Sequence, residues 1–417
     1  MNRTGRRIVI VISSLGGGGA ERVVSELCQY LVHDNRSVTL LTLSGKDPDA
    51  YKLHPGVVRE RMEIRRDAYS KFQSIKFTCH QIISIRRKIL SLNPDVVLSF
   101  IDQANIRTIM SMMGSGVPVV ISERIHPGLH RIPKGWDVLR RCFYRFAAAI
   151  VVQTEEVADW FRRSIRTQKL VVIPNAVRCD DFPVVAQSSS RTILSVGRLT
   201  HQKGFDILLR AFAKSGAKET GWRVVLLGEG PDRQALAQLA VDLGISSSVE
   251  MPGYVSDVPR WMAQAGIFAF PSRFEGFPNA LLEAMQSGLA CVSADCPSGP
   301  RVLIDDGCNG LLVPVNDVDA LARSIQLLSK NELMRTRLGR EAAKVRDRFS
   351  PAHIYKLWAA TLDSAMGPIS LAKDNVLAKG ARKGNVLEVQ RGLRVRQIEG
   401  PSRKEHFLVH RSRKEQR

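Results

Sequence analysis

Long uninterrupted apolar runs are missing from this chain of 417 residues. A helix that crosses a membrane needs about 18 or more consecutive apolar residues, and no segment of the sequence approaches that length. A secretory signal is missing too, because the apolar run at residues 8–12 is short and residues 16–22 do not resemble a small-residue cleavage site. We therefore expect a first strand at this position and a cytoplasmic protein.

Paired cysteines are also missing. The seven cysteines are scattered, and none stands in a CxxC pair, so neither a disulfide framework nor a zinc site is indicated. Asp47-Pro48-Asp49 has the DxD spacing of metal-dependent transferases, but it lies in a proline-interrupted loop without a third ligand. We expect no metal and no cofactor.

Acidic residues are relatively few: the chain has 40 Asp and Glu and 61 Lys and Arg, which gives a formal net charge of +21. Residues 1–185 carry 28 cations and 17 anions, residues 186–366 carry 20 and 18, and residues 367–417 carry 13 and 5. Such an uneven excess predicts an anionic partner: a membrane surface, a phosphorylated lipid or nucleic acid.

Short apolar runs alternate with segments of helical period along most of the chain. Strands are predicted at residues 8–13, 37–43, 96–100, 119–122, 149–154 and 169–174, and again at 192–197, 223–228, 249–251, 267–271, 290–294 and 310–313. Nearly continuous apolar strands separated by helices indicate parallel sheets covered on both faces. The fold class is therefore α/β, with two doubly wound, Rossmann-like domains.

The domain boundaries follow from this pattern. We expect one domain at residues 1–185, a second at 186–350, and a last helix at 351–366 that begins at Pro351. Residues 367–417 are rich in Lys and Arg and show no sustained period, so we expect a disordered tail.

A glycine-rich segment follows the first predicted strand and precedes a helix; it contains Gly17, Gly18 and Gly19. Glycines let backbone N–H groups approach an anion, and a helix N-terminus favours negative charge. The dinucleotide fingerprint is incomplete because Glu21 replaces its third glycine, and no Walker lysine follows. The segment is either a phosphate-binding turn or a flexible connection.

Two cations, Arg198 and Lys203, follow the first strand of the second domain. The carboxyl end of a parallel strand is where diphosphates bind in such sheets. An arginine there binds two oxygens and a lysine adds a point charge. The alternative is a pair of solvated surface charges, and the position at a strand end favours binding.

The most specific segment contains Glu275, Gly276, Phe277, Pro278 and Asn279, and Glu283 follows it. With Asn279 as the expected N-cap of a helix, backbone N–H groups form a cradle for an anion or hydroxyl. A carboxylate on each side of this cradle is suited to accept hydrogen bonds from sugar or ribose hydroxyls. A lone acid at position 283 would be read as an ordinary acid in the first turns of a helix, stabilised by the helix macrodipole, but the neighbouring motif favours binding here.

Together these motifs resemble glycosyltransferase family 4, the retaining transferases with the GT-B fold, in which two Rossmann-like domains face each other across a cleft. The resemblance covers most of residues 8–366. It rests on Gly18-Gly19-Ala20-Glu21-Arg22, Gln153-Thr154-Glu155, Ile173-Pro174-Asn175, Gly197-Arg198-Leu199, Lys203-Gly204, Leu227-Gly228-Glu229-Gly230-Pro231, Pro252-Gly253-Tyr254 and the E-x7-E pair Glu275/Glu283.

The resemblance implies roles for these residues. Arg198 and Lys203 would bind the donor diphosphate, with the glycine-rich segment closing over it. Glu283 would hold the ribose, and Glu275 the donor sugar, together with the backbone of residues 276–279. Tyr254 and Val255 lie where the family receives the base. No metal is implied, because cations and helix N-termini stabilise the leaving diphosphate.

One departure from the family concerns the segment after the fourth predicted strand. Many members carry a histidine there, whereas this chain reads Ser122-Glu123-Arg124-Ile125-His126-Pro127. A Ser-Glu-Arg-x-x-Pro segment resembles the subgroup that extends lipid-linked oligosaccharides with hexose or N-acetylhexosamine. Which of Glu123, Arg124 and His126 lies at the reacting centre stays open, and a structural pair of Arg124 with Glu123 is the alternative.

The predicted function is retaining transfer of a hexose or N-acetylhexosamine from a nucleotide sugar to a lipid-linked saccharide in polysaccharide biosynthesis, with UDP preferred by analogy. The basic segments 59–88 and 131–145 are candidate membrane-surface regions, so we expect the protein at the inner face of the membrane. The alternative for these segments is a solvated face over a buried stripe. The rival functions are a nucleotide-sugar epimerase on the same fold and a non-enzymatic polyanion-binding protein, and we expect no specific nucleic-acid partner.

Overall fold

The computed structural model describes residues 5–16, 18–44, 49–63, 71–130, 132–167, 169–178 and 189–367, with the backbone alone for 71–76. All of these residues belong to one compact unit, Met1–Pro368. Gly17, the Asp47-Pro48 pair, Arg131 and the predicted tail beyond Gly367 lie outside the described residues.

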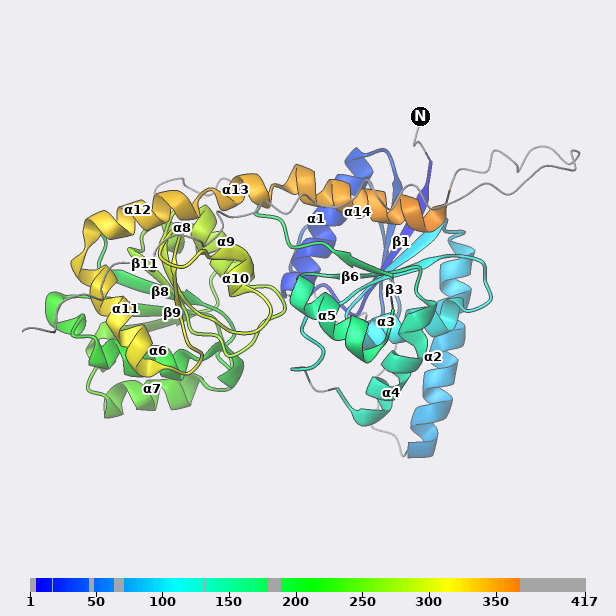
Figure 1. The fold of residues 1–417 in the computed structure, drawn as a ribbon. Helices are drawn as coiled ribbons and strands as arrows, with labels where there is room; N and C mark the ends of the chain where they lie inside the picture. Colours follow the sequence, from blue (N-terminus) through cyan, green and yellow to red (C-terminus); the bar gives the residue numbers. More distant parts are fainter. Residues whose placement is uncertain are drawn as a thin grey trace, which may run out of the picture. The chain divides into compact units, whose positions relative to one another are not determined.

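The first sheet has seven parallel strands in the order β3-β2-β1-β4-β5-β6-β7 (Figure 1). Their bounds are β1 Arg7–Ile12, β2 Ser37–Thr42, β3 Val57–Arg61, β4 Val96–Phe100, β5 Val119–Ser122, β6 Ala149–Val152 and β7 Leu170–Val172. Side chains alternate along each strand, so Ile8 and Ile10 face one hydrophobic cluster while Val9 and Val11 face another. Both faces are therefore buried, as the continuous apolar runs require.

Helices cover the two faces of the first sheet. One face packs against α1 Gly19–His33, and the other against α2 Lys71–Ser91, α3 Asp102–Met112 and α5 Glu155–Ser164. The helix α4 Lys134–Phe143 contacts α3 and is followed by the short helix η1 Tyr144–Phe146.

The second sheet has six parallel strands in the order β10-β9-β8-β11-β12-β13. Their bounds are β8 Thr192–Val196, β9 Arg223–Leu227, β10 Val249–Gly253, β11 Ile267–Phe270, β12 Ala290–Ala294 and β13 Leu311–Val313. One face packs against α6 Phe205–Lys214, α7 Arg233–Asp242, α11 Val318–Lys330 and α12 Glu332–Ala342. The other packs against α8 Val258–Ala263, α9 Asn279–Gln286, α10 Pro300–Leu303 and α13 Val345–Arg348. Three short helices, η2 His201–Lys203, η3 Lys218–Thr220 and η4 Ser246–Ser248, lie in loops.

The last helix, α14 Pro351–Met366, follows the second sheet in sequence but packs on the first. Trp358 is buried there with its ring 5.6 Å from that of Phe100 in β4. At the far end, Asp363 accepts hydrogen bonds from the Arg36 guanidinium at 2.9 and 3.0 Å. The first hydrophobic core is therefore completed by a helix that follows the whole second sheet in sequence.

The predicted pair of parallel α/β sheets is confirmed, and each strand predicted from the sequence is present with bounds that differ by at most two residues. Gly244 and Gly288 follow α7 and α9 with φ values of 65° and 77°, as expected of glycines that end helices. One strand was missed: β3 is an edge strand in which three of the five residues, Arg59 to Arg61, are charged, so it has no apolar run. The basic segment 59–88 is therefore not one surface element, since it starts in β3 and ends in α2.

The prediction that Asn279 is an N-cap is wrong. Pro278 occupies that position, and Asn279 is the first residue of α9. The physical reason is a competing partner, because the Asn279 side-chain oxygen accepts a hydrogen bond from Asn175 Nδ2 instead of from its own helix.

Candidate functional site

The candidate site lies at the point where the strand order of the second sheet reverses. The strand β8 lies between β9 and β11: the chain passes from β8 to β9 and β10 on one side, and then returns to form β11 on the other side. Loops that follow two such strands diverge and open a crevice, which is where open α/β sheets bind ligands. The loop after β8 carries Arg198 and Lys203, and the loop after β11 carries Glu275.

Lys203 and Glu275, which are 72 positions apart, meet here. Lys203 Nζ lies 2.7 Å from Glu275 Oε1, with side-chain exposures of 20% and 8%. The ammonium also lies 5.5 Å from the ring centroid of Phe270 at the end of β11. The site thus holds a partly exposed cation beside a nearly buried carboxylate, which together suit an anionic group and a hydroxyl group of one ligand.

Backbone and side-chain contacts hold the two loops together. Arg273 donates from its backbone N–H to the Gln202 carbonyl oxygen at 2.8 Å, and Gln202 Nε2 donates to the Phe274 carbonyl oxygen at 2.9 Å. The Arg273 guanidinium donates to both carboxylate oxygens of Asp206 at 2.9 and 2.7 Å. Burial alone raises the pKa of Asp206, but the Arg273 hydrogen bonds outweigh it and lower that pKa below its ordinary value.

The start of α9 touches residues of the first sheet's lobe. Asn175, which follows β7, donates to Asn279, and a Cβ atom added to Gly19 in α1 would lie 2.6 Å from Asn279 Nδ2. A Cβ atom added to Gly276 would lie 2.1 Å from the Arg124 carbonyl oxygen, so only glycine allows this approach. The two lobes therefore meet at the predicted cradle.

Glu283, the predicted ribose ligand, also bridges the lobes. Its Oε1 accepts a hydrogen bond of 2.6 Å from Arg22 Nη1 in α1, and the two side chains are 12% and 8% exposed. The alternative that Glu283 is an ordinary acid of the first helical turn does not fit, because Glu283 lies past the first turn of α9 and has a specific partner.

The three candidates after β5 have different surroundings. Glu123 is 2% exposed and accepts a hydrogen bond from the Tyr144 hydroxyl, and burial, with Asp102 nearby, raises its pKa to about 7. Arg124 donates to Asn175 Oδ1, the residue that contacts Asn279. The alternative that Arg124 pairs with Glu123 is therefore wrong, because neighbouring residues after a strand project in opposite directions.

His126 is nearly buried against Trp160, with ring centroids 6.4 Å apart. Its Nδ1 accepts a hydrogen bond of 3.1 Å from the Gly128 backbone N–H, and burial lowers the pKa of the imidazole. A neutral ring held in this way carries its proton on Nε2.

The remaining predicted residues are more open. Arg198 is exposed, and together with Arg124 it acts electrostatically on Glu21, a carboxyl group whose pKa burial raises. Tyr254 is 76% exposed, Val255 is half-buried, and both follow β10. The structure places Phe277 and Pro278 in the buried turn before α9.

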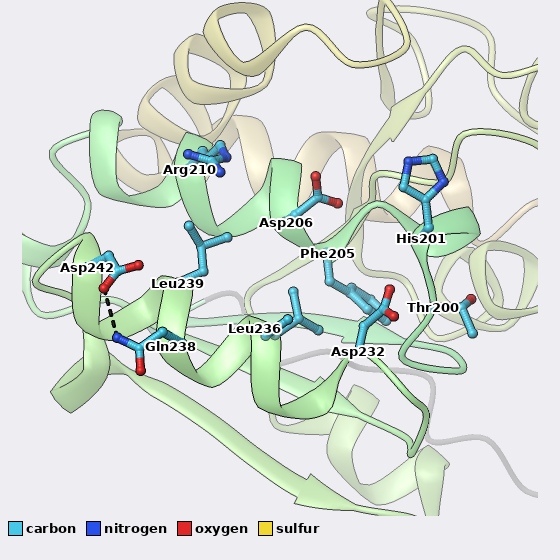
Figure 2. A pocket seen from close by; sticks show the side chains of 11 residues that line it. Thr200, His201, Phe205, Asp206, Arg210, Asp232, Leu236, Gln238, Leu239 and Asp242 are labelled. Carbon is cyan, nitrogen blue, oxygen red and sulfur yellow. Dashed lines mark hydrogen bonds between the residues drawn. The ribbon is translucent and has the colours of Figure 1, made fainter.

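A pocket of about 420 Å³ lies between α6 and α7, and Thr200 and His201 of the loop after β8 line one side of it (Figure 2). Phe205, Leu236 and Leu239 supply apolar walls, and Asp232 and Asp242 supply acidic groups. The predicted site residues do not line it. Its acidic character is also unsuited to a diphosphate.

Four residues that matter to the geometry were given no role from the sequence: Arg22, Tyr51, Asn175 and Arg273. Arg22 and Asn175 belong to the motifs Gly-Gly-Ala-Glu-Arg and Ile-Pro-Asn, so a signal for them was available. Tyr51, whose hydroxyl donates to the Gly18 carbonyl oxygen at 3.1 Å, stands in no motif.

The described part of the chain contains neither a cluster suited to a metal ion nor a helix suited to span a membrane. No group of three or more His, Cys, Asp or Glu residues there is arranged to hold a metal ion. No helix in the same residues has the length and apolar character needed to cross a membrane.

The sequence matches two family models: Glycosyltransferase Family 4 over residues 17–181 and Glycosyl transferases group 1 over residues 180–345. The chain is 28% identical over 358 residues to the GalNAc-alpha-(1->4)-GalNAc-alpha-(1->3)-diNAcBac-PP-undecaprenol alpha-1,4-N-acetyl-D-galactosaminyltransferase of Campylobacter jejuni, a match that covers 84% of this chain and 97% of the relative.

Solved structures share the fold. Sucrose-phosphate synthase from Thermosynechococcus elongatus superposes with a TM-score of 0.75 at 17% identity, covering 85% of this chain and 98% of the other. Anabaena HepE in complex with UDP superposes with a TM-score of 0.70 at 18% identity, covering 86% and 100%.

Proposed function

Since this chain belongs to the glycosyltransferases of group 1 and family 4, with the GT-B fold, we propose that it transfers a hexose or N-acetylhexosamine from a nucleotide sugar to a lipid-linked saccharide in polysaccharide biosynthesis. UDP is the proposed nucleotide and retention the proposed stereochemistry. The acceptor class is supported by the Campylobacter jejuni relative, whose name specifies an undecaprenol-linked saccharide. The nucleotide is supported by the UDP complex of the structural neighbour.

The observation that carries this proposal is the contact between Lys203 and Glu275 at the switch point of the second sheet, 2.7 Å apart. As the bond from sugar to diphosphate breaks, negative charge grows on the leaving oxygen. Lys203 stabilises that charge in the transition state more than in the ground state, which is the condition for faster chemistry. Arg198 adds a second cation, and Glu275 accepts hydrogen bonds from sugar hydroxyls.

The proposed mechanism needs no metal, because these cations and the N-terminus of α9 neutralise the diphosphate. The bond from the anomeric carbon to the diphosphate oxygen breaks, and the acceptor hydroxyl attacks that carbon from the same face. The hydroxyl proton passes to the departing diphosphate, and the configuration at the anomeric carbon is retained. Arg124 and His126 are the candidates to contact the reacting groups from the first lobe. Glu123 accepts a hydrogen bond from the Tyr144 hydroxyl and so holds this segment against the interior of the first lobe.

The first lobe also has a surface suited to an anionic membrane, which we include in the proposal. Val138 in α4 and Phe146 beside it are 58% and 56% exposed, and Arg141 and Arg145 lie exposed in the same segment. Exposed apolar groups among cations bind the boundary of an anionic leaflet. Such a position at the inner face of the membrane would bring the site to a lipid-linked acceptor.

The test is a donor screen with the purified chain. UDP-, GDP- and ADP-linked hexoses and N-acetylhexosamines are each incubated with and without a polyprenyl-diphosphate-linked saccharide, and nucleotide release is measured. We expect release from UDP sugars that depends on the acceptor, and NMR of the product should show the anomeric configuration of the donor. Isomerised donor without transfer would favour an epimerase instead.

A variant pair links this activity to the site. Lys203→Met should lose acceptor-dependent release, whereas Lys214→Met should keep it. Lys214 is a matched control because its Nζ also pairs with a carboxylate, Asp319 at 2.5 Å, on the same lobe but in exposed surroundings. Equal activity of both variants would contradict the role given to Lys203.

A further inference from the structure

Arg22 is an almost fully buried cation that no assigned role accounts for. It is 6% exposed, its Nη1 lies 2.6 Å from Glu283 Oε1, and its Nε lies 4.0 Å from Glu26 Oε1. Its remaining nitrogen, Nη2, is buried and contacts no hydrogen-bond acceptor in the part of the chain that the structure describes. A buried guanidinium N–H that binds nothing is unfavourable, so this group calls for an explanation.

The neighbours of Arg22 hold its guanidinium in place. Glu26 on the next turn of α1 accepts a hydrogen bond of 2.5 Å from the Tyr355 hydroxyl of α14. Burial lowers the pKa of Arg22, but the charges of Glu283 and Glu26 outweigh it and raise that pKa, so the side chain stays charged. The arginine is therefore a fixed donor whose orientation is set before any ligand arrives.

A tyrosine of the first lobe lies beside the segment that carries Arg22. The Tyr51 hydroxyl donates to the Gly18 carbonyl oxygen at 3.1 Å, and burial raises the pKa of this phenol. Tyr51 of the first lobe thus holds the glycine-rich turn before α1, the helix that carries Arg22.

We infer that Arg22 is a nucleotide-positioning residue, which orients Glu283 through one N–H group and presents a second N–H group to the ribose hydroxyls of the donor. This inference rests on the proposed function. A hydroxyl group both donates and accepts one hydrogen bond, so it can donate to the Glu283 carboxylate and accept from Arg22 Nη2. An adjacent carboxylate and guanidinium therefore complement a ribose diol, with nucleotide recognition shared between the two lobes.

A purely structural role predicts different behaviour. If the pair only joined the lobes, its loss would weaken all nucleotides equally. If Arg22 contacts the ribose, its loss should weaken ribonucleotides most, because a deoxynucleotide already lacks the hydroxyl group. Hydrogen bonds to charged groups correspond to about 10- to 100-fold in affinity, which is a measurable contrast.

The experiment is isothermal titration of the full chain with UDP, 2′-deoxy-UDP and 3′-deoxy-UDP. We expect the wild type to bind UDP at least about 10-fold more tightly than one of the deoxy analogues. Arg22→Gln should reduce UDP affinity by a similar factor and abolish that preference, as Glu283→Gln should. Arg22→Lys keeps the buried charge but lacks the planar fork, so it should restore stability without restoring the preference.

Arg36→Gln is the matched control. Arg36 is another buried arginine of the first lobe, with a side chain 0% exposed that contacts Asp34 and Asp363 and not Glu283. This variant should lose thermal stability and keep the wild-type ratio of UDP to deoxy-UDP affinity.

Three results would overturn the inference. An unchanged preference in both Arg22 variants would show that the residue only joins the lobes. Tighter UDP binding by Arg22→Gln would show that Arg22 competes with the nucleotide for Glu283. A wild type that binds no nucleoside diphosphate would remove the proposed function and the inference together, whereas the first two results leave the proposed function intact.

Discussion

Replacing Lys203 by methionine removes one charge from the site and keeps most of the side-chain volume. In the free protein, the change leaves the Glu275 carboxylate, 8% exposed, without the ammonium now 2.7 Å away. Breaking a buried ion pair costs about 3–5 kcal/mol, and the 20% exposure of Lys203 lets water replace part of the interaction. We therefore expect a smaller loss, about 1–3 kcal/mol in the free energy of unfolding.

The effect on catalysis should be larger and of a different kind. Removing one group that stabilises developing negative charge lowers kcat by about 10²–10³-fold, equivalent to about 2.7–4 kcal/mol. The loss should appear mainly in kcat, because the charge on the leaving diphosphate is greatest in the transition state. Continuous measurement of UDP release at saturating acceptor gives kcat and KM separately, with Lys214→Met as the control.

The pattern of the two constants decides whether the reasoning holds. A change in kcat of less than about fivefold, with a folded variant, would show that Lys203 does not face the leaving group, because it falls well short of the expected loss. A rise in KM alone would assign Lys203 to ground-state binding of the donor.

Three further predictions concern other parts of the molecule. Gly276→Ala places a methyl group against the Arg124 carbonyl oxygen, so it should reduce kcat/KM at least about tenfold, while Gly135→Ala, with open space around its Cβ, should have little effect. The pKa of Glu123 is raised to about 7, so its contribution to stability is complete below the ordinary value near 4.5 and is lost as pH rises towards 7. The melting temperature of the wild type should therefore fall as pH rises between these values, and Glu123→Gln should reduce this dependence on pH. An equal dependence in both proteins would assign the titration to another group. Vesicles with anionic lipid should recover the protein more than neutral vesicles do and less at high salt, and equal recovery would remove the electrostatic part of the membrane proposal.

Local patterns in the sequence determined most of the architecture. A strand buried on both faces must be apolar over its whole length, so β4, β5 and β12 were predicted with their observed bounds. The position of Lys203 and Glu275 followed from the same pattern, because loops after neighbouring parallel strands meet at one edge of the sheet. The edge strand β3 was not predicted, because most of its residues are partly or fully exposed and it therefore has no apolar run.

The partners of individual side chains were decided only by the tertiary structure. Arg22 and Glu283 lie 261 positions apart, and Asn175 and Asn279 lie 104 apart, in different lobes. Hydrophobic periodicity reports whether a residue is buried, which is a local property, and it carries no information about which distant side chain completes a hydrogen bond. The sequence by itself therefore determined the two sheets and the loops that carry the site, whereas the contact between the lobes decided which groups of that site are paired and which remain available to a ligand.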